Sequence, residues 1–583
     1  MYSVAVINII NLIQTGLSYL ALAQFSAYLW PQDAVVQDGA TFDYIIVGAG
    51  TAGNVLANRL TEDNNVNVLL IEAGGDAPVD VVVSIDIMRR VPGCTLFLKQ
   101  SNYDWNYTTE DYTIPKKCHQ KTYHEPSSGK MLGGTSSLNY MLYSRGHPTD
   151  YDNWATITND ETWKWENVLP YFKKSERIED PDFLLTGDMA NHGSEGFVGL
   201  TKESRTQTEN ILKSFNELGH DVIDDSTQGL GYSNPWIYIG KGGRQSSALT
   251  YLTPIKDREN LHLLKKAHVT KIIFDKNKNA EGVEVILDDG KTIHIKAAKE
   301  VILSSGTFGS AKILLLSGIG PKEELKSKNI DCISDLPVGK NLQDHTGVVL
   351  MHSMEKAERL ITNPNKHPSA PVVGYATLDK SHKHPDYQTM SFYAHSRLVL
   401  YFCSFAYKLS YEICDKIFTS SFGKYNLFTE IVNLNPKSKG EVTLRSSHPM
   451  DPPIIKTGYL ANEDDIDHLV KFTKLVLPIV NTTYFKSIGA ETLDPTLDNC
   501  SDFEKGTDDY WKCYASCMFS GLSNYVGTCA MGSVVDGRLK VLGVQRLRVV
   551  DASVMPVITR GNTAGPTTMI AEKAADFIKE KEN

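Results

Sequence analysis

Three glycines near position 50 have the spacing that brings a protein backbone close to a phosphate group. They belong to the G-x-G-x-x-G segment Gly48-Ala-Gly50-Thr51-Ala52-Gly53. In such a segment the first glycine permits a tight turn, the second lets the backbone approach a pyrophosphate, and the third allows close packing of helix and strand. Glu72 follows Gly53 by 19 residues (72 − 53). At that distance its carboxylate can accept hydrogen bonds from the ribose hydroxyls of an adenosine.

Two strands and a helix are needed to hold this turn in place. Residues 42–47 form a short apolar run that is typical of a buried parallel strand, and residues 54–60 continue with helical spacing. Residues 66–71 form a second apolar run, which Glu72 ends. These elements predict a strand–helix–strand unit whose helix N-terminus stabilises phosphate charge, and Thr51 and Ala52 belong to the same predicted site. The pattern predicts a bound dinucleotide but does not distinguish FAD from NAD.

Residues 129–146 contain a second glycine turn, which two hydroxyl side chains follow directly. Gly133 and Gly134 precede Thr135 and Ser136, so the amides and side chains of this loop can hold a phosphate or a flavin edge. The segment resembles the first signature of the glucose–methanol–choline oxidoreductases, which are FAD enzymes. Residues 306–320 resemble the second signature of that family, with Ala311 where proline is usual, and residues 338–345 and 547–576 also match. The resemblance extends in order over nearly all of residues 41–581.

The resemblance implies which further residues hold FAD. The implied cofactor residues are Gly133, Thr135, Ser136 and Asn139 in the loop, Val269, whose backbone meets the adenine in relatives, and Asp551 with Ala552 after a predicted strand. Leu138 stands where some relatives carry a histidine that forms a covalent bond to the flavin. Because leucine has no nucleophile, we predict that the FAD is noncovalent. We predict no metal centre.

The resemblance also identifies two catalytic positions, and one of them departs from the family. Alcohol oxidation by a flavin needs loss of the hydroxyl proton and transfer of a hydride, and a histidine usually assists the first step. Asn524 stands at the position of that histidine, and Asn562 at a second position that is histidine or asparagine in relatives. An amide does not titrate near pH 7, so Asn524 can orient a substrate but cannot accept its proton. The alternative acceptors are water or another histidine, such as His345 or His395.

The positions of the motifs predict a fold of the α/β class, with a Rossmann-like FAD-binding domain and a discontinuous α+β substrate-binding domain. Residues 41–147, 195–345 and 528–580 are expected to form the FAD-binding part. Residues 148–194 are expected to form a substrate or lid segment, and residues 346–527 the substrate-binding domain. The active site is then expected between the two halves, which is a usual place for a pocket.

The charge and the N-terminus indicate an exported protein that does not bind polyanions. The net charge is −10 and no basic cluster is present, which argues against nucleic acids and anionic membranes as partners. Residues 1–23 are largely apolar and end in Ala21-Leu-Ala23, a cleavage signature, although no Lys or Arg precedes Arg59. We predict a signal peptide over residues 1–23. The alternative is an uncleaved membrane anchor.

The cysteines and the glycosylation sequons are compatible with export. The chain has nine cysteines, which suits a few disulfides and leaves at least one thiol unpaired. Cys500 and Cys513 are close together in a polar stretch that is predicted to be a loop, and we predict that they pair. Sequons at Asn106, Asn481 and Asn499 support secretion together with the leader.

The sequence therefore predicts a secreted FAD-dependent oxidoreductase that acts on CH–OH groups of an aromatic alcohol, a sugar or a sterol. Its expected partners are the alcohol substrate and an electron acceptor, either oxygen or another. Neither nucleic acid nor, after removal of the leader, a membrane is expected as a partner. Residues 510–513 and the spacing of the insertions resemble the insect branch of the family. The alternative is a flavin-binding paralogue with weak or lost turnover, because Asn524 replaces the catalytic histidine.

Overall fold

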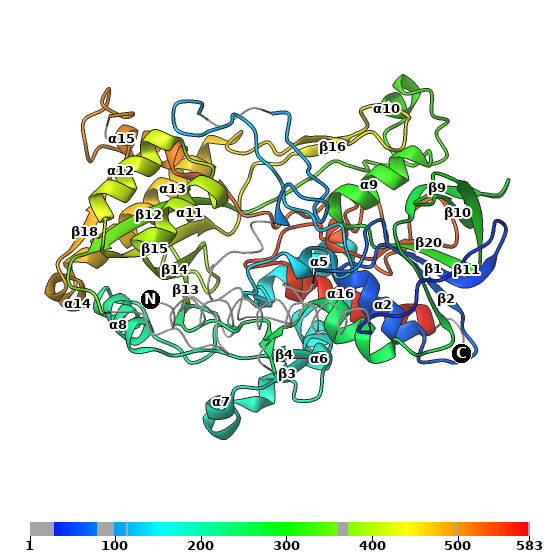
Figure 1. The fold of residues 1–583 in the computed structure, drawn as a ribbon, viewed down its shortest axis with the longest axis horizontal. Helices are drawn as coiled ribbons and strands as arrows, with labels where there is room; N and C mark the ends of the chain where they lie inside the picture. Colours follow the sequence, from blue (N-terminus) through cyan, green and yellow to red (C-terminus); the bar gives the residue numbers. More distant parts are fainter. Residues whose placement is uncertain are drawn as a thin grey trace, which may run out of the picture.

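A computed structural model describes residues 28–78, 98–111, 115–227, 229–241, 243–358, 371–496 and 498–580. Two seven-stranded sheets lie toward opposite ends of the long axis of the molecule (Figure 1). The first sheet has the order β8-β2-β1-β11-β10-β9, with β20 paired to β11. Its strands are β1 (Thr41–Val47), β2 (Val68–Ile71), β8 (Leu261–Leu264), β9 (His268–Phe274), β10 (Ala280–Ile286), β11 (Thr292–Leu303) and β20 (Leu547–Val549).

The strand–helix–strand unit at the start of this sheet follows the predicted pattern. Strand β1 and strand β2 are parallel, and helix α2 (Thr51–Leu60) connects them. The second strand begins at Val68, two residues later than predicted. Helix α2 packs against helix α16 (Ala564–Lys579) near the C-terminus, where Arg59 Nε lies 2.7 Å from Glu572 Oε2. The first helix of the nucleotide-binding unit and the last described helix of the chain thus pack against each other.

The second sheet is antiparallel throughout and has the order β18-β12-β15-β14-β13-β5, with β19 paired to β12. Its strands are β5 (Gly231–Ser233), β12 (Thr346–Met354), β13 (Pro371–Ala376), β14 (Tyr387–His395), β15 (Tyr425–Asn433), β18 (Ala490–Leu493) and β19 (Phe519–Gly521). Helices that contact it are α11 (Ser396–Tyr401), α12 (Tyr411–Ser421), α13 (Glu463–Val476) and α15 (Asp508–Cys517). The predicted α/β fold is confirmed.

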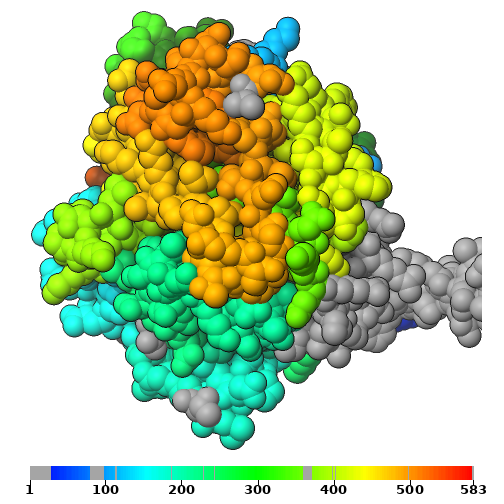
Figure 2. Space-filling model, turned by 90° about the vertical axis from the view of Figure 1, so that its left-hand side faces the viewer, coloured from blue at the N-terminus to red at the C-terminus, as the bar shows by residue number. Residues whose placement is uncertain are grey.

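Helix α8 (Thr206–Glu217) packs against the second sheet. In the sequence, however, it comes before β9, β10 and β11 of the first sheet. It contacts β13, β5 and helix α14 (Thr483–Ser487). Figure 2 shows the green atoms of this segment directly against the orange atoms that follow residue 460. Segment 195–345 therefore contributes to both sheets. The remaining helices of six or more residues are α5 (Pro148–Thr158), α6 (Trp165–Ser175), α7 (Pro181–Thr186), α9 (Gly306–Leu316) and α10 (Lys322–Ser327).

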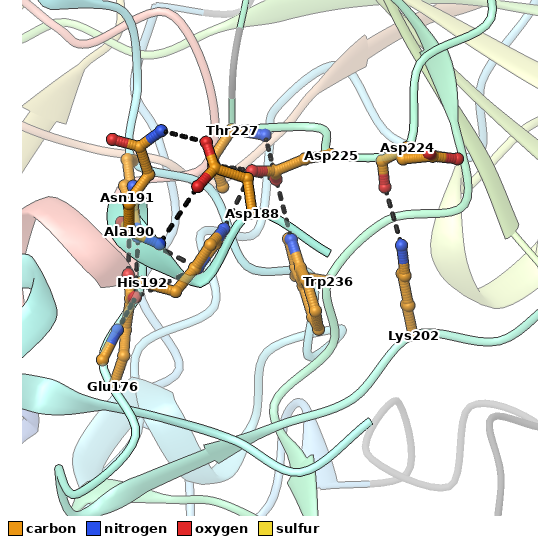
Figure 3. A network of polar contacts seen from close by, with 12 residues as sticks. Glu176, Asp188, Ala190, Asn191, His192, Lys202, Asp224, Asp225, Thr227 and Trp236 are labelled. Atoms are coloured by element: carbon orange, nitrogen blue, oxygen red, sulfur yellow. Dashed lines mark hydrogen bonds and ion pairs between the residues drawn. The ribbon is translucent and has the colours of Figure 1, made fainter. Parts of the chain in front are cut away.

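A buried network of charged and polar side chains holds together parts of residues 145–236 (Figure 3). Nη2 of Arg145 lies 2.6 Å from Glu176 Oε2, and His192 lies between two carboxylates, with Nδ1 3.3 Å from Glu176 and Nε2 2.8 Å from Asp225. Trp236 Nε1 also donates to Asp225, at 2.8 Å. Burial opposes the charge on His192, but the hydrogen bonds to Asp225 and Glu176 outweigh it and raise the pKa of His192. The network therefore holds a charged imidazole in the interior.

Three disulfides are present among the described residues, and they include the predicted one. Cys500 pairs with Cys513, and the other two pairs are Cys118–Cys517 and Cys403–Cys414. The prediction of a loop is only partly right, because Cys513 and Cys517 lie on helix α15. Cys332 and Cys529 are free, and Cys94 lies outside the described residues.

The predicted signal peptide, residues 1–23, lies outside the described residues. Within the part of the chain that the structure describes, no helix combines the length and apolarity needed to cross a membrane. Asn106 and Asn481 are exposed, whereas Asn499 is partly buried and its amide donates to Lys117 O at 3.0 Å. Two of the three sequons are thus on the surface.

Candidate active site

One large cavity is lined by residues of both sheets and by the loops between them. One end reaches Glu72 and Val269 in the first sheet, and the other reaches Phe392, Phe428 and other side chains of the second sheet. The predicted site residues that line it are Gly48, Gly50, Thr51, Ala52, Glu72, Thr135, Ser136, Asn139, Val269, Asn524, Asp551, Ala552 and Asn562. The cavity thus brings together residues that are up to 514 positions apart (562 − 48).

The glycine turn has the geometry that an approaching phosphate requires. Gly48 has φ +103°, and a Cβ there would lie 2.6 Å from the Ser304 carbonyl oxygen. A Cβ at Gly50 would meet only that oxygen, at 3.9 Å, so the space beside this residue is open. No side chain caps the N-terminus of helix α2, which begins at Thr51 in the cavity wall. Its first amides are therefore available to an anion.

Gly53 and Gly133 do not line the cavity and support it from behind. A Cβ at Gly53 would lie 1.9 Å from the Gly48 carbonyl oxygen, so only glycine lets α2 pack this closely on β1. A Cβ at Gly133, which has φ +89°, would lie 2.3 Å from Ser137 Oγ. Both residues act on a cofactor only through the shape of the turns that they permit.

The carboxylate of Glu72 is fixed by two backbone amides. Its Oε2 accepts from Ala49 N at 2.9 Å, and its Oε1 accepts from Gly74 N at 2.8 Å. Burial raises the pKa of Glu72 to about 7 in spite of these bonds. Each carboxylate oxygen has a second lone pair, so Glu72 can still accept from a ribose while it holds the glycine turn.

The loop after the second glycine turn folds into a short 3₁₀ helix, Gly134–Ser137, beside the first turn. The Thr135 side chain is exposed to the cavity, and its Oγ1 accepts from Gly129 N at 3.3 Å. Ser136 instead donates to Gly133 O at 2.6 Å and accepts from Ser247 N at 3.0 Å. Asn139 Oδ1 accepts from Arg244 Nη1 at 2.9 Å. Thr135 is therefore presented to a ligand, whereas Ser136 mainly shapes the loop.

Asp551 fastens helix α9 to the cavity wall. Its Oδ2 accepts from Gly306 N at 2.9 Å and from Ser310 Oγ at 2.6 Å, and its Oδ1 accepts from Ser553 N at 2.9 Å. Burial raises the pKa of Asp551 although these donors favour its charge. Ala552 follows it in the lining without a polar side chain.

The lining fits an extended dinucleotide such as FAD. The uncapped amides of α2 suit a pyrophosphate, the Glu72 carboxylate suits a ribose, and Val269 lies in the wall at the same end. Leu138 is buried and lines the cavity where a covalently attached flavin would need a nucleophile. The predicted cofactor residues other than Gly53 and Gly133 thus line one cavity.

Asn524 contacts a histidine that lies behind the cavity wall. Its Nδ2 is 3.2 Å from His345 Nδ1, and its backbone N donates to Asp344 Oδ1 at 2.6 Å. Burial lowers the pKa of His345 to about 4 and raises the pKa of Asp344 to about 7. His345 is thus neutral at pH 7 and can orient the Asn524 amide. Neither His345 nor His395, the other alternative base, lines the cavity.

Asn562 lines the same cavity, and the turn that carries it is held by an ion pair. Arg560, two residues earlier, donates from its backbone N to Asp150 Oδ2 at 2.7 Å, and its guanidinium pairs with Asp150 Oδ1. A Cβ at Gly561, which has φ +147°, would lie 2.2 Å from Ser144 Oγ. The turn therefore has little freedom to move.

Sequence analysis missed two ionisable side chains in the half of the cavity formed by the second sheet. Glu430 on β15 and Lys99 line it. Burial raises the pKa of Glu430 to about 7, and burial lowers the pKa of Lys99. Gly347 on β12 lies beside Glu430, and a Cβ there would be in van der Waals contact with Glu430 Cγ, at 3.4 Å. No local motif marks Glu430, because its position depends on the pairing of β15 with β12.

Comparison with known proteins agrees with this geometry. Two GMC oxidoreductase family models match residues 42–347 and residues 436–571. The chain is 40% identical to an ecdysone oxidase of Bombyx mori over 94% of this chain and 84% of that protein. It is 36% identical to a glucose dehydrogenase [FAD, quinone] of Drosophila melanogaster over 92% of this chain and 87% of that protein.

A solved structure shares the fold over almost the whole chain. The formate oxidase of Aspergillus oryzae RIB40, an enzyme whose FAD undergoes modification, superposes with a TM-score of 0.77 at 26% identity. The superposition covers 94% of this chain and 99% of that one. With two family models, close relatives and this fold in agreement, the chain belongs to the GMC oxidoreductase family and is an FAD-dependent oxidoreductase that acts on alcohols.

Proposed function

We propose that this protein oxidises a hydroxyl group on a bulky apolar skeleton, an aromatic alcohol or a sterol, in preference to a sugar. The observation that carries the proposal is the lining of the cavity beside Asn524. It consists largely of apolar and aromatic side chains, namely Leu142, Met390, Phe392, Phe402, Tyr407, Phe428 and Leu522. A sugar would leave most of its hydroxyls without partners against such a wall, which is costly, whereas a ring system would gain from burial.

The residues of this chain would orient the alcohol in two ways. The Asn524 amide, held by His345, would accept a hydrogen bond from the substrate hydroxyl, and the Asn562 amide would fix the reacting carbon from the other turn. When bound, FAD supplies the hydride acceptor. The aromatic wall would exclude water from the reacting carbon.

The hydroxyl proton needs an acceptor that Asn524 cannot provide. Glu430 is the group in this half of the cavity whose pKa, at about 7, suits a general base at neutral pH. Its carboxylate would accept the proton directly or through one water molecule. If neither route operates, the chain is a flavin-binding paralogue with weak turnover.

The test is anaerobic bleaching of the flavin absorbance after mixing with a panel of alcohols. We expect a sterol or a benzylic alcohol to bleach the flavin faster than glucose at equal concentration. Faster bleaching by glucose would contradict the proposed substrate class. No bleaching by any member of the panel would favour the paralogue.

We also propose that the protein is exported after removal of residues 1–23, that it carries N-linked sugar, and that its FAD is noncovalent. Exposed Asn106 and Asn481, together with three disulfides, support export. N-terminal sequencing of protein from the medium should begin near Gln24. Recovery only in the membrane fraction, with Met1 intact, would contradict export.

A further inference from the structure

Two histidines and an aspartate converge at the tip of the hairpin formed by β13 and β14. His382 Nδ1 lies 3.4 Å from Asp386 Oδ2, and His384 Nδ1 lies 3.9 Å from Asp386 Oδ1. The two imidazole rings are 5.1 Å apart between centroids, and one ligand atom from each of the three residues lies within 4.8 Å of the others. Three groups that commonly bind metals therefore face one point.

These separations are close to those around a small tetrahedral ion. Bonds of about 2.0–2.1 Å from zinc to nitrogen or oxygen imply about 3.3 Å between neighbouring ligand atoms. The 3.4 Å from His382 Nδ1 to Asp386 Oδ2 meets that value, whereas the 3.9 Å from His384 Nδ1 ends on the other carboxylate oxygen, Oδ1, so His384 would have to move toward the ion. A wider octahedral oxygen site for Mg²⁺ or Ca²⁺ would need more carboxylates than this tip supplies.

The carboxylate of Asp386 is held in place for such a role. Its Oδ2 lies 2.7 Å from Thr377 Oγ1 and accepts from Leu378 N at 2.8 Å, and its backbone N donates to Ala376 O at 2.9 Å. These donors resemble those that orient ligands from outside a metal centre.

His384 provides an independent sign of a missing partner. Its Nδ1 is buried and makes no hydrogen bond with any residue that the structure describes. A buried ring nitrogen without a hydrogen-bond partner is unfavourable, and a metal ion would supply the partner. His147 lies edge-on to His384, with 6.5 Å between centroids, and is the nearest further imidazole.

Positive charges near the tip would weaken the site without abolishing it. Lys380 and Lys383 belong to the same loop, and Arg560 Nε donates to Pro385 O at 3.2 Å. Arg560 is itself paired with Asp150, so part of its charge is neutralised. Asp379 adds a negative charge, and its Oδ1 accepts from Ser381 N at 2.8 Å.

We propose that His382, His384 and Asp386 bind one divalent transition-metal ion of the zinc type, separate from the flavin site. Two imidazoles and one carboxylate are a donor set that zinc accepts with a position left open to water. The ion would stabilise the tip of the hairpin beside Pro385. The carbonyl of Pro385 accepts a hydrogen bond from Arg560, which belongs to the turn that carries Asn562. Sequence analysis predicted no metal centre, because the spacing of the three residues alone does not show that their ligand atoms converge.

The test is calorimetric titration of the purified flavoprotein with ZnCl₂, with MgCl₂ as the control ion. We expect one Zn²⁺ per chain. Loss of an outer donor typically costs about 10–100-fold in metal affinity, so Thr377→Val should weaken binding by about 10-fold or more and Asp386→Asn by more than that. His382→Ala with His384→Ala should abolish saturable binding.

His448→Ala is the matched control, since His448 is an exposed imidazole 3.8 Å from a single carboxylate, Asp451. It should leave Zn²⁺ binding unchanged. The flavin absorbance of every variant reports whether the fold is intact. Absence of one-to-one binding in the wild type, or binding that survives loss of both histidines, would overturn the proposal.

Discussion

Replacement of Asn524 by histidine tests whether the proton acceptor is the weak point of this active site. In the structure the Asn524 side chain is 9% exposed, lines the cavity and contacts His345. A histidine there would place a titratable ring where an amide now stands. If hydride transfer is otherwise intact, we expect Asn524→His to accelerate reduction of the flavin.

The size of the effect follows from the burial of this position. A positioned base typically contributes about 10²–10⁴-fold in rate. The buried ring of His345 beside it has a pKa lowered to about 4, and a histidine at 524 would experience similar desolvation. A less basic ring accepts a proton less readily, so we reduce the expected gain in rate by about tenfold. The expected gain is about 10–10³-fold, or about 1.4–4 kcal/mol of barrier.

The assay is stopped-flow bleaching of the flavin without oxygen, with one sterol and one benzylic alcohol, from pH 6 to pH 9. Asn524→Gln is the control, because it keeps an amide and adds no base, and it should not accelerate the reaction. A fast wild-type rate that Asn524→His lowers would refute the reasoning. The amide would then be adapted to its own mechanism, with the base elsewhere.

Three further predictions concern other groups. We expect the bleaching rate of the wild type to rise with pH through about pH 7, and Glu430→Gln should remove this rise. The control variant Glu441→Gln should keep it. A rate that continues to increase with pH in both variants would indicate that hydroxide, not Glu430, accepts the proton. The pKa of Glu430 is higher in the folded state than in the unfolded state, so the folded state binds more protons between about pH 4.5 and pH 7. The free energy of unfolding should therefore fall as pH rises through this range. Glu430→Gln should make this fall less steep when unfolding is measured in urea. His192→Gln should destabilise the fold by about 3–5 kcal/mol at pH 5, since it removes the cation between two buried carboxylates; Glu176 keeps Arg145, but Asp225 keeps only the neutral donors Thr227 and Trp236. Because the pKa of His192 is raised in the folded state, its contribution is complete below about pH 6.5 and declines as pH rises through the folded pKa, and a loss that grows with pH would contradict this. Acid precipitation should release all flavin into the supernatant, because Leu138 offers no nucleophile; yellow colour in the pellet would contradict noncovalent binding.

Local signals made the nucleotide half of the fold predictable. The apolar run of β1, the glycine turn and the start of α2 depend on neighbouring residues, and the structure has them within three residues of the prediction. The Cys500–Cys513 pair, 13 residues apart, was predicted, whereas the Cys403–Cys414 pair, 11 residues apart, was not. Such features follow from the chain itself before any distant segment is placed.

Features that depend on pairing between distant segments were not predictable. Cys118 and Cys517 are 399 residues apart, and nothing near either cysteine indicates the other. Strand β5 joins the second sheet through β13, although it lies among the nucleotide-binding segments in sequence. Glu430 pairs with Val349 across β12 and β15 and lines the cavity, a position that depends on the register of these two strands.

The surroundings of Asn524 explain why a substitution there should change chemistry more than geometry. Gln343 and Val526 exchange backbone hydrogen bonds at 3.0 and 2.9 Å, and Leu522 N donates to His345 O at 3.2 Å. Asp344 holds the intervening amides, at 3.1 Å for Ser523 and 2.6 Å for Asn524. Ser523, at φ +58°, is kept in the left-handed region by these bonds. Since the segment is fixed through its backbone on both sides, a new side chain at 524 inherits its position, and a change in rate reports on the side chain itself.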